Sequence, residues 1–158
     1  RRLVRNLMRS GQEAKLGADR QTVTILFTDI AGFTPVVEST EPSIVLDALE
    51  EYLNCMNIEL KKSHGTVAQY LGDAIMAFWN APLEDGKHAC NAVEAARRMI
   101  LTMERVNQEL KDSGKSQFDL KIGVGLGTGY CVVGNMGSDQ RFDYTVLGAR
   151  INTGILVD

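Results

Sequence analysis

Residues 66–79 read TVAQYLGDAIMAFW, two apolar runs of strand-like composition joined by Gly72-Asp73. Runs of this length on either side of a turn-forming pair are typical of a β-hairpin. The stretch therefore predicts two adjacent antiparallel strands, residues 66–71 and 74–79, with Asp73 in the turn between them.

Helical patterns flank this hairpin on both sides. Apolar residues recur at steps of three and four over residues 42–62, and His64-Gly65 supplies the end of that helix. A second apolar stripe predicts a helix from about Lys87 to Asp112. Further strands are expected at residues 22–28, 120–126, 130–136 and 144–147.

A hairpin set between two helical crossovers is the split βαβ arrangement of a ferredoxin-like α+β fold, with helices on one face of an antiparallel sheet. In this arrangement the first strand is a neighbour of the hairpin. Asp29, which follows that strand, is therefore expected beside Asp73. Paired carboxylates suit hard divalent cations. Each also has a structural explanation, Asp73 as a turn residue and Asp29 as a cap for the next helix.

The segment after Asp29, residues 30–35 (IAGFTP), places a glycine turn ahead of a helical stretch. Backbone N–H groups at such a turn can bind phosphate. A metal site next to a phosphate site indicates nucleotide chemistry.

The bulk composition limits the remaining function classes. A length of 158 residues suits one domain with its own core. A net charge of −3 does not predict a nucleic-acid-binding surface. The three separated cysteines predict neither a disulfide framework nor a zinc site, and the sequence has no signal peptide or membrane-spanning run.

Four stretches resemble, in the right order, the opening motif, the central hairpin and the last active-site region of one family. They are residues 23–34, 70–78, 134–138 and 142–152. The family is the catalytic domain of class III adenylate and guanylate cyclases, in its bacterial form. The resemblance implies the class III cyclase fold for residues 21–158, truncated at the C-terminus, and a linker from a missing upstream sensor domain for residues 1–20.

The resemblance also implies a reaction. The 3′-hydroxyl of ATP attacks the α-phosphorus of the same molecule, which yields 3′,5′-cyclic AMP and pyrophosphate, with two divalent cations, Mg²⁺ or Mn²⁺, as cofactors. The active sites are expected at the interface of a head-to-tail homodimer. The domain is expected in the cytoplasm, with a membrane-anchored receptor as one full-length arrangement.

The resemblance assigns roles to individual residues. The expected metal ligands are the carboxylates of Asp29 and Asp73 and the backbone carbonyl of Ile30. The amides expected to meet the terminal phosphates are those of Gly32, Phe33 and Thr34.

Two further site residues are expected near the C-terminus. Arg141 is the candidate phosphate cation, with a solvated loop arginine as the alternative. Asn152 matches the asparagine that orients the ribose, although it could also simply begin a helix.

Gln69 and Thr145 are expected to read the base. Adenylate-forming relatives usually carry lysine at the position of Gln69 and guanylate-forming relatives glutamate, whereas a glutamine amide both donates and accepts. We expect ATP as the substrate because residue 69 is not glutamate. A guanylate cyclase, which would use GTP, remains an alternative.

One departure from the family pattern affects catalysis. Four residues after Asn152 the family has an arginine for the α-phosphate, and this chain has Leu156. Either the natural protein is catalytically impaired or the terminus is not native, and in both cases this fragment is expected to be a poor catalyst. The alternative function is a non-catalytic nucleotide-binding or dimerisation module. A diguanylate cyclase is disfavoured because its Gly-Gly-(Asp/Glu)-Glu-Phe signature is absent.

Overall fold

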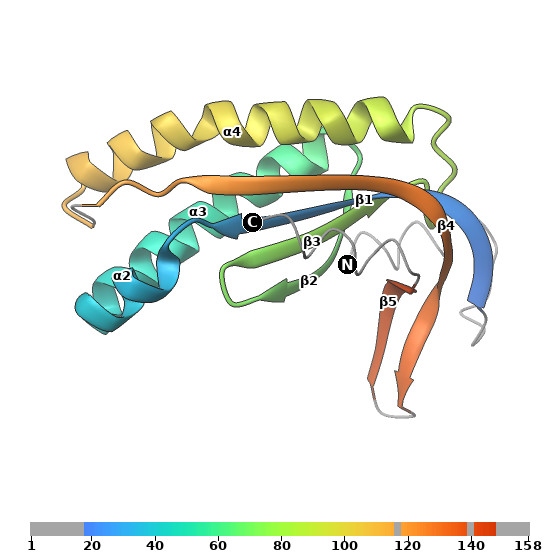
Figure 1. Ribbon diagram of the computed structural model, residues 1–158, viewed down its shortest axis with the longest axis horizontal. Coiled ribbons are helices and arrows are strands. Elements are labelled where there is room, and N and C mark those ends of the chain that lie inside the picture. The colour runs from blue at the N-terminus through green and yellow to red at the C-terminus, as the bar shows by residue number, and fades with distance from the viewer. Residues whose placement is uncertain (1–17, 116–117, 139–140, 148–158) are drawn as a thin grey trace.

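The computed structural model describes residues 18–115, 118–138 and 141–147. These residues form one five-stranded antiparallel sheet, in the order β2-β3-β1-β4-β5, with helices packed on one face (Figure 1). The elements are β1 (Ala18–Ile30), α2 (Phe33–Ser39), α3 (Pro42–Lys62), β2 (Thr66–Leu71), β3 (Ala74–Trp79), α4 (His88–Asp112), β4 (Ile122–Ser138) and β5 (Arg141–Leu147). The expected α+β fold with a split βαβ core is confirmed.

The hairpin and both long helices lie where the sequence predicts them, but two strand predictions are wrong. β1 begins at Ala18 instead of residue 22, so it takes in the end of the expected linker. The strands expected at 120–126 and 130–136 are one continuous strand, β4. The predicted break at residues 127–129 (GTG) is paired residue for residue with β1, and this pairing overrides the local turn preference of glycine.

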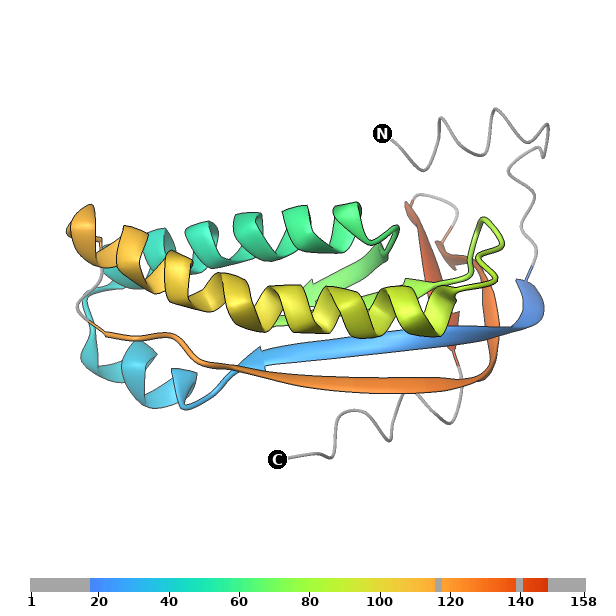
Figure 2. The ribbon, with the colours of Figure 1, turned by 90° about the horizontal axis from the view of Figure 1, so that it is seen from above.

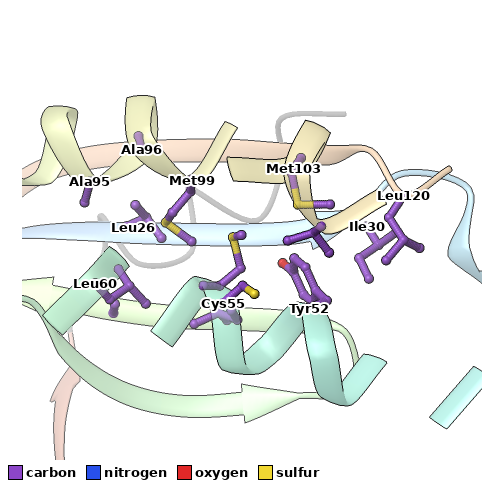
Figure 3. Packing of buried hydrophobic residues seen from close by; sticks show 14 of the residues in the cluster. Leu26, Ile30, Tyr52, Cys55, Leu60, Ala95, Ala96, Met99, Met103 and Leu120 are labelled. Carbon is purple, nitrogen blue, oxygen red and sulfur yellow. The ribbon is translucent and has the colours of Figure 1, made fainter. Parts of the chain in front are cut away.

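The main core lies between the sheet and the helix pair α3 and α4, which run side by side above it (Figure 2). Figure 3 shows apolar side chains from β1, α3 and α4 converging in this layer. A second buried cluster lies on the opposite face of β1 and β3, beneath the curled part of β4 and β5. Its buried members are Val23, Ile25, Met76, Phe78, Ala81, Cys131, Val133 and Val146. The two central strands are thus covered on both faces, which fixes the register of the edge that carries the candidate site.

The end of α3 is held by backbone and side-chain contacts. His64 adopts a left-handed conformation (φ 64°), and the Gly65 N–H donates to the Leu60 carbonyl at 2.9 Å. The buried indole N–H of Trp79 donates to the Ser63 carbonyl at 2.7 Å. The bond from Trp79 ties the helix end to the last residue of β3.

Gly65→Ala is expected to destabilise the fold by about 1–3 kcal/mol, because overpacking strains a filled core. A Cβ at Gly65 would lie 2.7 Å from Trp79 Cζ2 and 3.2 Å from the Leu60 carbonyl oxygen. Gly86→Ala is the matched control, since a Cβ there meets nothing within 4 Å. The measurement is the free energy of unfolding in urea. Equal stability of the two variants would contradict this account.

Candidate functional site

The end of β1 and the turn of the β2–β3 hairpin meet at one edge of the sheet. β1 and β3 are antiparallel, with Thr28 opposite Ile75, so the turn that precedes β3 lies beside the residues that end β1. The backbone N–H of Ile30 donates to Asp73 Oδ2 at 2.8 Å. The convergence expected from the sequence is therefore present: Asp73 binds the residue that follows Asp29.

Asp29 lies on the exposed side of this edge. Its cross-strand partner on β4 is Gly123, and a Cβ built there would lie only 2.9 Å from Asp29 Oδ1. Gly123 therefore leaves the space that the Asp29 carboxylate occupies. Sequence reasoning missed this role, because the glycine lies 94 residues from its partner and only the strand register shows the pairing.

A buried tyrosine lies under the same edge. The Tyr52 hydroxyl of α3 is 3.1 Å from Thr28 Oγ1. Burial raises the pKa of Tyr52 to about 12. The hydrogen bond with Thr28 opposes this rise, and the negative charges of Asp73 and Asp29 add to it.

The expected phosphate loop follows directly. Gly32 has φ 65° and precedes α2, so its left-handed backbone turns the chain from β1 into the helix. The Ala31 N–H donates to the Lys121 carbonyl at 2.8 Å, which fixes the start of the turn. Phe33 is half-buried against the main core and Thr34 is exposed. The first N–H groups of any helix lack intrahelical acceptors, and here they lie next to the aspartate edge.

The expected base-reading and ribose residues are only partly described. Gln69 is exposed on β2, with its Nε2 3.9 Å from Met76 Sδ. Thr145 and Arg141 lie in β5, opposite Gly134 and Ser138, and their side chains are outside the described part of the chain. The sheet curls so that its edge strands β2 and β5 contact each other, which brings the strands of Gln69 and Thr145 together.

Asn152 and Leu156 also lie outside the described residues. The structure therefore leaves their expected roles as predictions.

Another group of potential metal ligands lies between α3 and α4. Ligand atoms of Glu51, Cys55 and Glu109 fall within 4.8 Å of one another. The two carboxylates already have cationic partners, with Lys115 3.8 Å from Glu51 and Arg105 2.9 Å from Glu109. Burial raises the pKa of the Cys55 thiol, which disfavours the thiolate that binds metals. The group of Glu51, Cys55 and Glu109 is therefore a weaker candidate for a divalent cation than the aspartate edge.

Comparison with known proteins agrees with this geometry. The model of the adenylate and guanylate cyclase catalytic domain matches residues 17–157. This chain belongs to that family. The resemblance noted in the sequence is thereby confirmed, and the family uses divalent metal ions.

Both adenylate cyclases and a guanylyl cyclase are similar to this cyclase domain. Adenylate cyclase 1 of Rhizobium meliloti is 36% identical over 150 residues, which is 95% of this chain and 22% of the relative. The guanylyl cyclase Cya2 superposes with a TM-score of 0.84 at 35% identity, covering 88% of this chain and 70% of that one. The adenylyl cyclase CyaB from P. aeruginosa gives 0.83 at 37% identity, covering 89% and 72%.

This cyclase domain spans about a fifth of the Rhizobium relative. Among its described helices, none combines the length and apolar character needed to cross a bilayer.

Gly123→Ala is expected to weaken binding of a divalent cation at the aspartate edge by roughly 10-fold, because groups around metal ligands hold those ligands in place. The new methyl group would displace the Asp29 carboxylate. Stability should change little, since the displaced atoms end an exposed side chain. The Mn²⁺ affinity is measured by titration followed by electron paramagnetic resonance. Gly86→Ala is the control. Unchanged Mn²⁺ affinity would show that Asp29 tolerates the methyl group.

Proposed function

We propose that this domain is the catalytic domain of an adenylate cyclase that converts ATP to 3′,5′-cyclic AMP and pyrophosphate. The observation that carries the proposal is the bond from the Ile30 N–H to Asp73 Oδ2, because it brings two acidic positions 44 residues apart to one edge. Support also comes from the family membership of residues 17–157.

The proposed metal ligands are the carboxylates of Asp29 and Asp73 and the carbonyl of Ile30, with Mg²⁺ or Mn²⁺ as the ions. When bound, two such ions would supply activation of the attacking hydroxyl and neutralisation of charge on the phosphates. The donor set fits because it is made of oxygen atoms. Asp73 Oδ2 accepts a hydrogen bond from the Ile30 N–H, and a carboxylate has further lone pairs with which it can bind an ion.

The protein's own contribution is positioning. The hydroxyl and the phosphorus belong to the same ATP molecule, so the site has only to fold the substrate and hold it. The amides of Gly32, Phe33 and Thr34 are proposed to bind the terminal phosphates, and Arg141 to add a positive charge. Asn152 is proposed to orient the ribose.

Gln69 and Thr145 are proposed to contact the adenine. A glutamine amide accepts a hydrogen bond from the exocyclic amine and donates one to a ring nitrogen. A glutamate at this position would instead attract the N–H donors of guanine. The choice of ATP rests on this residue, because proteins similar to this domain include both adenylate and guanylate cyclases.

The active form is proposed to be a head-to-tail homodimer in which one chain supplies the metal ligands and the other the residues that contact base and ribose. Exposed apolar side chains on β4 and β5 support a subunit contact: Leu126, Tyr130 and Leu147 are 40%, 66% and 55% exposed. An upstream sensor that sets the geometry of this dimer is part of the same proposal.

Asp29→Asn and Asp73→Asn are each expected to lower cyclic AMP formation at least ~100-fold, because each removes charge that holds a catalytic cation. The control is Asp119→Asn, which removes an exposed carboxylate from the ion pair with Lys111. Cyclic AMP is measured with Mg²⁺ and with Mn²⁺, in the 158-residue chain and in the full-length gene product.

Equal residual activity in the Asp29, Asp73 and Asp119 variants would exclude the assigned metal site. Metal-dependent nucleotide binding without any cyclic product, even in the full-length protein, would instead select the binding-module alternative.

Gln69→Glu is expected to shift the preference from ATP toward GTP by on the order of 10-fold, and Gln69→Lys to shift it the other way, since a site built for one hydrogen-bonding pattern rejects the other. The ratio of kcat/KM for cyclic AMP and cyclic GMP formation is the readout. If neither variant changes this ratio, Gln69 does not read the base.

A further inference from the structure

We propose that Tyr52 is a positioning residue for the metal site, whose hydroxyl contact with Thr28 steadies the end of β1 and so the relative position of the Asp29 and Asp73 carboxylates. This inference rests on the proposed function, because it assumes that the two carboxylates bind divalent cations.

The contact is buried and specific. Tyr52 is fully buried in the middle of α3, Thr28 is 3% exposed, and their hydroxyl oxygens are 3.1 Å apart. Figure 3 shows the Tyr52 ring rising from α3 with its oxygen directed toward β1. An apolar side chain would fill the same core position without a polar atom. A buried hydroxyl costs free energy unless it is hydrogen-bonded, so this tyrosine depends on Thr28.

Thr28 occupies the position from which the site can be fixed. It immediately precedes Asp29, and two residues later the Ile30 N–H holds Asp73. Three consecutive residues of β1 therefore have three roles at this edge. Thr28 contacts α3, Asp29 carries the exposed carboxylate, and Ile30 binds the hairpin turn. Loss of the hydroxyl contact removes a polar link between α3 and the end of β1, while the pairing of β1 with β3 and β4 keeps the strand in place. The expected effect is a local shift of Asp29 relative to Asp73, without a detached strand.

The electrostatics favour a neutral phenol at this place. Burial raises the pKa of Tyr52 to about 12, the Thr28 hydrogen bond lowers it, and the charges of Asp73 and Asp29 raise it further. At neutral pH, Tyr52 is therefore an uncharged hydroxyl. It adds no third negative charge beneath the two carboxylates.

The same strand offers a matched control four residues earlier, in its middle. Thr24 lies on the same face of β1 as Thr28 and is also buried, at 2% exposed. Its hydroxyl is 2.7 Å from His88 Nδ1 and 2.7 Å from Thr128 Oγ1. Thr24→Val thus removes a buried hydroxyl from β1 without touching the aspartate edge.

The experiment titrates Mn²⁺ alone into the 158-residue chain and follows free Mn²⁺ by electron paramagnetic resonance, with thermal unfolding measured in parallel. Tyr52→Phe and Thr28→Val are each expected to weaken Mn²⁺ binding roughly 10-fold. Thr28→Ser keeps the hydroxyl and is expected to bind as the unmodified chain does. Thr24→Val is expected to lower the melting temperature and leave Mn²⁺ affinity unchanged.

The double variant Tyr52→Phe with Thr28→Val is expected to bind Mn²⁺ no more weakly than either single variant, because both remove the same contact. If Tyr52→Phe does not fold, the comparison of Thr28→Val with Thr28→Ser decides the question. Mn²⁺ affinity that follows melting temperature across all variants, Thr24→Val included, would overturn the inference and leave Tyr52 a core residue only.

Asp29→Asn and Asp73→Asn separate this inference from the function on which it rests. If they abolish Mn²⁺ binding while Tyr52→Phe and Thr28→Val do not weaken it, the positioning role is wrong and the metal site stands. If they leave Mn²⁺ binding intact, the proposed metal site itself is wrong.

Discussion

One hydrogen bond, from the Ile30 N–H to Asp73 Oδ2, brings together the two acidic positions on which the proposed metal site depends. It joins the last residue of the central strand to the turn of a hairpin that begins 36 residues later. A carboxylate that accepts a backbone N–H is held in one orientation. The bond thus fixes one of the two acidic side chains, and the pairing of β1 with β4 fixes the other by placing Asp29 opposite Gly123.

The topology explains why this edge can hold two negative charges. β1 lies between β3 and β4. The turn before β3 supplies Asp73, and β4 supplies Gly123, which leaves space for the Asp29 carboxylate. The core below is apolar and the polar groups there are few: the Tyr52 and Thr28 hydroxyls bind each other. Two negative charges at one edge repel each other, and the proposed divalent cation would relieve that repulsion.

The sequence predicts the parts of this structure that local patterns control. The periodicity of residues 42–62 and the turn pair Gly72-Asp73 specify α3 and the hairpin with the observed bounds. The break expected at residues 127–129 is absent because glycine's preference for turns is weak beside a full ladder of hydrogen bonds to β1. The roles of Gly123 and Tyr52 depend on which residue faces them across the sheet or the core. No local pattern contains that information.

The most direct test of the central claim is the position of the metal. Crystals of the domain grown with Mn²⁺ and a non-reactive ATP analogue, measured at the manganese absorption edge, locate every bound ion by its anomalous signal. The account predicts a peak within about 2–2.5 Å of carboxylate oxygens of both Asp29 and Asp73, the usual range for such ions and oxygen ligands. Manganese bound only elsewhere, with the two carboxylates directed away from the nucleotide phosphates, would contradict it.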